Sequence, residues 1–313
     1  MTSATSQGPQ LSVLVLTRNR LEALRDCIRS ILGQSLADFE VVVLDDASDG
    51  TDTAAAVKRE FGDERVRAFR VPEQLGVSGG RNSLMQQARG EVLVSIDDDA
   101  VFTKDDALAK VEDCFAQDDS VGAVAFHVTN VVNATRTPTV PFSRAAIARD
   151  PQIIARRAAV SSFRGCGHAI RKRVVDRLGG YRSDMFFGEE ELDLAYRIIQ
   201  AGARIVYEPE IEVEHFPMPS QVGRANGQTS VELYYHVRNR AYLAYRYLPW
   251  RYAIPYLAVW MAHYSLRSIR GDGVWNLVRG VWATPSYLRG VTREVLDRNA
   301  LAYLTRHGGR LWY

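Results

Sequence analysis

Short apolar runs alternate with segments of helical periodicity in the first half of the chain. The apolar runs cover residues 11–16, 40–44, 66–71 and 91–96. The segments between them, where apolar residues recur every three or four positions, are 21–32, 52–61 and 78–89. The runs are typical of buried strands and the segments of amphipathic helices. This alternation with short links predicts an α/β fold, with a mostly parallel sheet and helices on both of its faces.

The second half of the chain is less regular. Its pattern predicts a strand at 121–128 and a loop at 131–142. Residues 163–170 resemble a strand interrupted by glycines, and glycine inside a strand often marks the close approach of a ligand or another backbone. A strand at 204–207 and a closing segment at 211–215 follow.

Acidic residues follow two of the predicted strands. Asp45 and Asp46 end the second strand, and Asp97, Asp98 and Asp99 follow the fourth. In open α/β sheets this edge is where ligands bind. Three adjacent carboxylates repel one another unless a cation neutralises them, and oxygen ligands at this density suit Mg²⁺ or Mn²⁺. The alternative is an acidic turn that caps the next helix.

A second group of acids begins a predicted helix. Glu189, Glu190 and Glu191 are followed closely by Asp193. Acids in a first turn interact favourably with the helix dipole and need no further role. The functional alternative is a catalytic carboxylate placed at the start of a helix.

Length and composition fit an ordinary globular protein. The 313 residues suffice for a domain of roughly 200 to 250 residues and an appendage. The three cysteines form neither a metal-binding pattern nor a disulfide framework, which favours a reducing, cytoplasmic location. Residues 1–9 are polar and lack the apolar core of a signal peptide, so we expect a disordered tail. No apolar run is long enough to span a membrane.

Charge and aromatic residues concentrate at the C-terminal end. Residues 236–313 contain twelve Arg, no Lys and three acids, a net charge of +9, whereas the rest of the chain carries −7. All five Trp lie there: Trp250, Trp260, Trp275, Trp282 and Trp312. An amphipathic helix rich in Arg and Trp suits peripheral contact with an anionic membrane surface, here the inner face of the cell membrane. The alternatives are a helical cap packed on the rest of the protein and a dimer face.

Several motifs in a fixed order carry a family resemblance. They are SVLVLTRNR, LDDASDGT, GVSGGRN, SIDDDAVF, FRGCGHAI, GEEELDLAYRI and EVEH. From about Leu11 to Arg240 the chain resembles the inverting family 2 glycosyltransferases of the GT-A fold, of the rhamnosyltransferase-like or polysaccharide type. The resemblance implies a catalytic domain at 10–240 and leaves 241–313 as a basic, aromatic-rich helical region.

The resemblance implies donor-binding residues. Thr17 ends the first strand beside the nucleotide, and Asp46 lies where the family contacts the nucleobase or ribose. Gly80, Arg81 and Asn82 begin a helix, and Arg81 is expected to pair with the diphosphate unless it is a solvated surface charge.

The resemblance also implies a metal site. Asp97 and Asp99 match the family's DxD motif. Asp99 is expected to bind Mn²⁺ or Mg²⁺, Asp97 to orient the ribose or the waters of the metal, and Asp98 to support them. His215 closes the motif set as a metal-ligating or phosphate-facing histidine.

The helix-start acids match the family's E-D-x-D-L or E-E-x-D-L pattern. Its second acid is the expected general base, which makes the base Glu191, with Glu190 left open as the alternative. The base would take a proton from an acceptor hydroxyl during a single displacement that inverts the anomeric carbon.

The implied function is metal-dependent transfer of a sugar from a UDP- or dTDP-sugar to a glycan, lipid-linked or small-molecule acceptor, in cell-surface polysaccharide or glycoconjugate synthesis. Glycosylation of a small natural product and a non-catalytic binding protein are the alternatives. A nucleotidyltransferase or a Rossmann dinucleotide site would need a glycine-rich loop after the first strand, where the chain has Thr17-Arg18-Asn19-Arg20. No nucleic-acid-binding module is present in the sequence.

Overall fold

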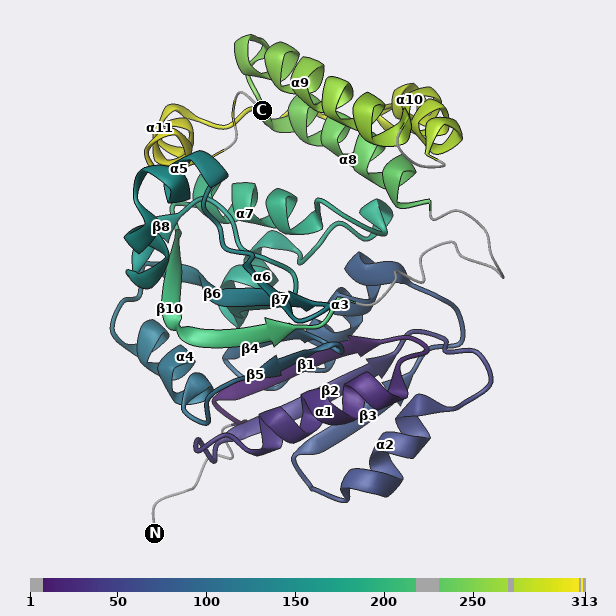
Figure 1. The fold of residues 1–313 in the computed structure, drawn as a ribbon, viewed down its shortest axis with the longest axis vertical. Helices are drawn as coiled ribbons and strands as arrows, with labels where there is room; N and C mark the ends of the chain where they lie inside the picture. Colours follow the sequence, from purple (N-terminus) through teal and green to yellow (C-terminus); the bar gives the residue numbers. More distant parts are fainter. Residues whose placement is uncertain (1–7, 218–230, 270–272, 310, 312–313) are drawn as a thin grey trace.

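The computed structural model describes residues 8–217, 231–269, 273–309 and residue 311. It has a central sheet flanked by helices, with further helices gathered at one end (Figure 1). The predicted disordered tail lies, apart from Gly8 and Pro9, outside the described residues, so its order stays a prediction.

The first half of the chain forms a parallel sheet. Its strands are β1 (Leu11–Thr17), β2 (Phe39–Asp45), β3 (Val66–Arg70) and β4 (Val92–Asp97), in the spatial order β3-β2-β1-β4. The helices between them are α1 (Leu21–Leu32), α2 (Thr53–Phe61) and α3 (Gly76–Gln87). The predicted strands and helices are therefore confirmed to within about two residues at each end.

The sheet separates two hydrophobic cores. Successive side chains of a strand point to opposite faces, and in β1 the residues Val13 and Val15 belong to one core while Leu14 belongs to the other. Both sets are buried because helices cover both faces, which explains why this strand is apolar throughout.

The second half of the chain extends the same sheet with mixed pairing. The added elements are β5 (Ala100–Phe102), α4 (Ala107–Ala116), β6 (Val121–Val132), β7 (Thr135–Pro138), β8 (Ala158–Val160), β9 (Gly167–Arg171) and β10 (Arg204–His215). Strand β9 lies antiparallel between β4 and β6, whereas β6 and β10 are parallel. The parallel order thus holds for the first half, and antiparallel strands enter beyond β4.

Two local predictions in this half were wrong. Residues 131–142 are not simply a loop, because β6 continues to Val132 and turns through Asn133 and Ala134, both with positive φ, into β7. The strand at 204–207 and the segment at 211–215 are one strand, β10, whose pairing with β6 shifts register between Glu208 and Glu212.

Helices complete the molecule. They are α5 (Arg144–Arg149), α6 (Lys172–Leu178), α7 (Glu190–Gln200), α8 (Glu232–Tyr247), α9 (Trp250–Ile269), α10 (Val274–Tyr287) and α11 (Arg298–Arg306), with 3₁₀ turns at Pro151–Ala155 and Ser183–Met185. The helical C-terminal region is confirmed. Helices α8, α9 and α10 form a layer beyond α7 at one end of the molecule (Figure 1).

The helical layer packs closely and begins earlier than expected. A Cβ on Gly280 of α10 would lie 2.9 Å from the carbonyl oxygen of Tyr234 on α8, so the glycine allows these helices to touch. The predicted boundary after residue 240 falls inside α8. None of the helices in the described part of the chain is long and apolar enough to cross a membrane.

Candidate active site

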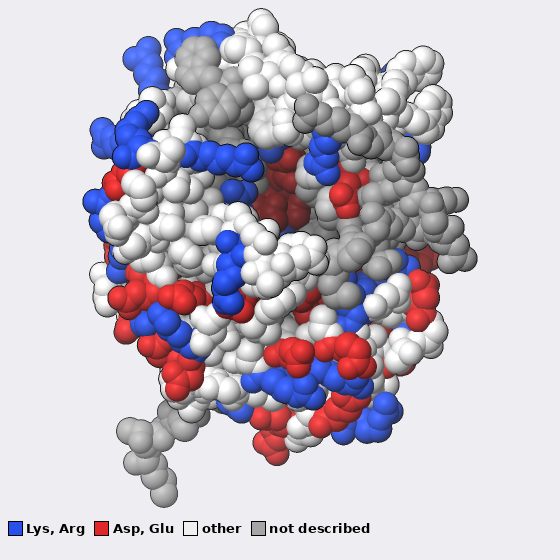
Figure 2. All heavy atoms as spheres, viewed as in Figure 1, with Lys and Arg blue, Asp and Glu red and all other residues white. Residues whose placement is uncertain are grey.

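A cavity of about 580 Å³ opens where the strand-end acids meet the start of α7 and the helical layer. Figure 2 shows acidic side chains at the bottom of a hollow in the middle of this face, below the helical layer. The C-terminal ends of β1, β2 and β4 form one wall, and α7 and α8 form others. This is the edge of the sheet at which the sequence predicts a ligand.

The strand-end acids, Asp97, Asp98 and Asp99, are joined to β1 and the residues after it. Thr17 donates a hydrogen bond of 2.7 Å from its Oγ1 to Asp98. One nitrogen of Arg20 lies 3.0 Å from a carboxylate oxygen of both Asp98 and Asp99. Arg20 therefore offsets part of the charge that three neighbouring carboxylates create.

Asp97, Asp99 and His215 offer ligand atoms that all lie within 4.8 Å of one another. His215 ends β10, and its Nε2 lies 3.1 Å from Asp99 while its Nδ1 lies 2.9 Å from the side-chain oxygen of Asn130. A second partner of this kind fixes the orientation of a metal-binding imidazole. Two carboxylates and an imidazole fit Mn²⁺, and with added water Mg²⁺.

Burial shifts the pKa values of this cluster. Burial raises the pKa of Asp98 to about 7, although the Arg20 guanidinium opposes the shift and the Asp99 carboxylate adds to it. Burial alone would lower the pKa of His215, but its hydrogen bond to Asp99 and the nearby carboxylates outweigh burial and raise it. The cluster therefore holds more negative potential than Arg20 removes.

Asp46 lies at the edge of the cavity and is bound to the next loop. Its two carboxylate oxygens accept hydrogen bonds from the backbone nitrogens of Leu75 and Gly76, at 2.7 and 3.1 Å. Burial raises its pKa, and these two donors only partly offset that effect. Asp46 thus both lines the cavity and shapes the turn that begins α3.

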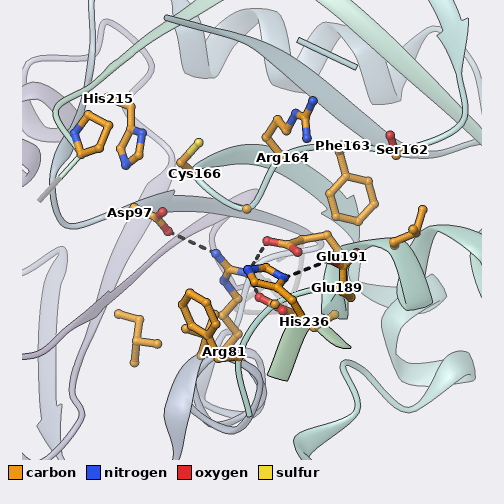
Figure 3. Close-up of a pocket in the computed structure, with 18 of the residues that line it drawn as sticks. Arg81, Asp97, Ser162, Phe163, Arg164, Cys166, Glu189, Glu191, His215 and His236 are labelled. Carbon is orange, nitrogen blue, oxygen red and sulfur yellow. Dashed lines mark hydrogen bonds and ion pairs between the residues drawn. The ribbon is translucent and has the colours of Figure 1, made fainter. Parts of the chain in front are cut away.

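Arg81 joins the strand-end acids to the helix-start acids, Glu189, Glu190 and Glu191. Its guanidinium nitrogens lie 3.1 Å from each of Asp97, Glu190 and Glu191, and Figure 3 shows it between Asp97 and Glu191. With only 7% of its side chain exposed, Arg81 is not a solvated surface charge. Arg81 pairs with carboxylates and also lines the cavity, so its contact with a diphosphate stays a prediction.

The two candidate bases differ in exposure. The side chain of Glu191 is 22% exposed and that of Glu190 only 3%. Burial, followed by the charge of Glu191, raises the pKa of Glu190 well above its ordinary value. Glu191 is therefore the carboxylate that an acceptor in the cavity can reach more easily.

Gly80 and Asn82 do not line the cavity. A Cβ on Gly80 would lie 2.5 Å from the side chain of Leu16, so this glycine lets α3 pack against β1. The side chain of Asn82 donates to the carbonyl of Tyr181 at 2.7 Å and accepts from its N–H at 2.8 Å. The prediction of direct donor contact is not supported for either residue; both position the helix that carries Arg81.

The turn before α7 is held in an unusual conformation. Phe186 and Glu189 have positive φ angles of 62° and 71°, which residues other than glycine rarely adopt. Asn239 on α8 donates to the carbonyl oxygens of Met185, Phe187 and Gly188, at 2.8 to 3.1 Å. The helical layer thereby fixes the segment that presents the helix-start acids.

Glycines between β8 and β9 allow side chains to approach. A Cβ on Gly165 would lie 2.1 Å from Oε1 of Glu191, and one on Gly167 would lie 2.9 Å from Val128. The strand predicted at 163–170 begins only at Gly167, and the groups that approach these glycines are side chains, not a ligand or another backbone. At Gly165 the approaching group is the candidate base.

Three cavity residues were missed in the sequence: Arg20, His236 and Arg240. On α8, His236 lies 3.1 Å and Arg240 lies 2.7 Å from Glu189. Burial alone would raise the pKa of Glu189, but these neighbours outweigh it and lower the pKa. Arg20, three positions beyond β1, could have been suspected from its place beside the strand ends, whereas nothing local pairs α8 with Glu189.

Comparisons with known proteins agree with this geometry. The model of "Glycosyl transferase family 2" matches residues 12–179, more than half of the chain. The GalNAc(5)-diNAcBac-PP-undecaprenol beta-1,3-glucosyltransferase of Campylobacter jejuni is 35% identical over 29% of this chain and 30% of its own length. The beta-monoglucosyldiacylglycerol synthase of Trichormus variabilis is 25% identical over 74% of this chain and 48% of its own length.

The chain aligns with between 25% and 58% of the length of the curated relatives it matches. Among solved structures, a mannosyltransferase from Pyrobaculum calidifontis in complex with GDP-Man and Mn²⁺ has a TM-score of 0.56 and 22% identity. That alignment covers 98% of this chain and 82% of the other. At this identity the likeness shows a shared fold.

Proposed function

Because this chain belongs to glycosyl transferase family 2, we propose that it transfers a sugar, with inversion, from a nucleoside-diphosphate sugar to an acceptor hydroxyl. One observation carries the proposal. A ligand trio for a divalent ion (Asp97, Asp99 and His215) and an accessible carboxylate, Glu191, line one cavity.

The strand-end wall supplies the donor site. Thr17 and Asp46 line the cavity on the nucleotide side, and Asp97, Asp99 and His215 would hold Mn²⁺ or Mg²⁺. Such an ion neutralises charge that develops on a diphosphate leaving group. Arg20 contacts both Asp98 and Asp99 and so holds these two acids together. The sequence did not predict this cation beside the strand-end wall.

The start of α7 supplies the base. Arg81 contacts Oε1 of Glu191, so the other oxygen is the one that would take the proton of the acceptor hydroxyl. The raised pKa of the buried Glu190 favours its protonated form, which would not compete for that proton. Attack on the anomeric carbon from the side opposite the diphosphate gives inversion.

The acceptor is a hydroxyl of a glycan or glycoconjugate, and the UDP- and dTDP-sugars are the first donors to test. The names of two relatives contain a lipid, PP-undecaprenol in one and diacylglycerol in the other. A lipid-linked acceptor is therefore the first acceptor class to test, ahead of a free polymer or a small natural product.

A donor panel tests the proposal. The protein is incubated with UDP-, dTDP- and GDP-sugars and Mn²⁺, and binding is read by thermal shift and slow hydrolysis by release of nucleoside diphosphate. We expect one nucleotide class to stabilise the protein and to be hydrolysed. Binding without hydrolysis or transfer would favour a non-catalytic binding protein, and no response to any nucleotide-sugar would overturn the proposal.

A further inference from the structure

The outer surface of α9 and α10 carries an unusual number of exposed apolar side chains. Ten large ones are between 41% and 85% exposed: Trp250, Ile254, Val259, Leu266, Ile269, Val274, Trp275, Val278, Val281 and Trp282. Outside these two helices, only four comparably exposed large apolar residues occur in the described part of the chain. Scattered exposed apolar residues are normal, but a group of this size marks an interaction surface.

The spacing in α10 shows that this surface is one continuous helix face. Val274, Trp275, Val278, Val281 and Trp282 follow the one-, four-, seven- and eight-residue offsets of a single helical stripe. The opposite side of α10 is already used, because Gly280 and Asn276 are buried toward the rest of the helical layer. The exposed stripe is therefore additional to the packing that holds α10 in place.

Helix α9 has the same two-sided character. Ala253, Tyr256 and Tyr264 are buried on its inner side, whereas Ile254 and Ile269 are exposed on its outer side. A helix that is apolar on both sides is usually surrounded by apolar material. Within the described ranges of the chain, protein covers only the inner side of α9.

The charges of the two helices favour one occupant. From Trp250 to Arg289 the chain has five Arg and one Asp, with no Lys and no Glu. Two copies paired through this face would bring like charges together, since an isologous contact places the same surface on both partners. An anionic bilayer matches the arginines, and exposed Trp rings sit well at the level of lipid headgroups. The part of this end that Figure 2 shows is largely uncharged, with Lys and Arg at its edges.

Aromatic residues connect this surface to the cavity. Tyr256 and Tyr264 of α9 accept hydrogen bonds from Arg240 at 2.6 and 3.1 Å, and the same guanidinium lies 3.5 Å from the ring centre of Trp260. Arg240 in turn contacts Glu189 in the cavity. A partner bound at the outer side of α9 would therefore be separated from the helix-start acids by one layer of helices.

We propose that the exposed apolar face of α9 and α10, flanked by arginines, docks the protein on an anionic membrane surface, with both helices lying in the interface plane. This binding mode needs no spanning helix and places the cavity where a lipid-linked acceptor would present its head. Docking is separate from the transfer chemistry, so it can be tested whether or not the proposed function holds.

Flotation of the full-length protein with vesicles tests the proposal. The vesicles contain phosphatidylcholine alone or a mixture with phosphatidylglycerol. We expect binding to the mixed vesicles and a blue shift of Trp fluorescence. Trp275→Ala combined with Trp282→Ala should reduce vesicle binding by about tenfold or more, because these rings are 70% and 85% exposed and contribute to the interface rather than to folding.

Charge is tested by Arg267→Glu, which should weaken binding to the anionic vesicles about fivefold or more. Val132→Ser and Arg59→Glu are matched controls, since they change an exposed valine and an exposed arginine away from α9 and α10 and should leave binding unchanged. Donor binding should be unchanged in all these variants. Wild-type protein that fails to bind anionic vesicles, or that forms a dimer dissociated by the double Trp substitution, would overturn the membrane proposal.

Discussion

Two groups of three acids face the same cavity, yet their surroundings differ. The strand-end acids share Arg20 and meet His215, and together they offer a trio of ligand atoms for a divalent ion. The helix-start acids meet Arg81, Arg240 and His236, and no comparable trio forms there among the residues that the structure describes. Side-chain type alone does not separate a metal site from a base; the placement of the neighbouring groups does.

These surroundings indicate different roles for the helix-start acids and the strand-end acids. Protein cations contact the helix-start acids, and the raised pKa of Glu190 favours its protonated form, which leaves Glu191 as the proposed proton acceptor. Burial, with the Asp99 carboxylate adding to it, raises the pKa of Asp98 against the opposing charge of Arg20, so added positive charge would stabilise the strand-end acids. We therefore expect an added divalent ion to bind the strand-end acids and not the helix-start acids.

The largest effect is expected at the base. Glu191→Gln removes the proton acceptor but keeps the hydrogen-bonding shape, so kcat should fall by about 10²- to 10⁴-fold. Donor binding, measured by thermal shift, should stay close to that of wild type. Steady-state kinetics with a responsive donor and acceptor pair check this.

Glu190→Gln is the matched control for this substitution. Because burial and the charge of Glu191 favour the protonated form of Glu190, the neutral glutamine resembles that form and should retain most activity. If Glu190→Gln loses turnover and Glu191→Gln does not, the base is Glu190 and the assignment of the two groups shifts by one residue.

Arg81 is the residue that both groups share, and its loss should weaken the fold. Arg81→Gln leaves three carboxylates without their common cation, and breaking a buried ion pair costs about 3–5 kcal/mol. Chemical denaturation should therefore show a lower free energy of unfolding, with Arg81→Lys intermediate because lysine lacks the planar fork.

Arg25→Gln is a control for arginine loss in general, since Arg25 pairs with Glu22 and Glu60 on the surface of α1 and α2. It should unfold close to wild type. Equal stability of Arg81→Gln and wild type would show that the two acid groups do not depend on a shared cation.

Most of the strand-end wall could be predicted from the sequence, because the pattern that identifies each strand lies within one short segment of the chain. Strands β1, β2 and β4 are buried on both faces, so each is mostly apolar, and acids stand at the ends of β2 and β4. In β7 the four residues Thr135–Pro138 are all exposed, which removes the apolar alternation that would have identified a strand. Pro209, at the irregular point of β10, similarly made one strand look like two.

The cations of the site could not be predicted for a different reason. Arg240 meets Glu189 across 51 positions of sequence, and Arg20 meets Asp99 across 79. Neither pair leaves a periodic pattern, because each depends on how the helical layer and the sheet edge pack. Arg81 was identified as important, but its three carboxylate partners come from two separate elements and only the fold reveals them.

Metal binding should distinguish the two groups directly. With Mn²⁺ at about 100 times its Kd, the wild-type protein should gain about 2.7 kcal/mol of stability. Asp99→Asn should lose most of that gain and the metal-dependent transfer, whereas Asp105→Asn, an exposed acid nearby, should keep both. Thermal shifts with and without EDTA check this; an Asp99→Asn protein that responds to Mn²⁺ like wild type would contradict the strand-end site.

A slope of about 1.4 kcal/mol per pH unit tests whether the strand-end acids lack positive charge when no metal is present. The folded protein raises the pKa of Asp98 from 3.8 to about 7. Between these values the folded state holds a proton that the unfolded chain releases, so the free energy of unfolding should fall as pH rises. Asp98→Asn cannot ionise and resembles the protonated acid, so it should lack this component. Denaturant unfolding of both proteins in EDTA across this range measures the difference. If the two stability curves run parallel, Asp98 is ionised in the folded state, the cations beside the strand-end acids compensate the cluster, and the contrast between the two acid groups does not hold.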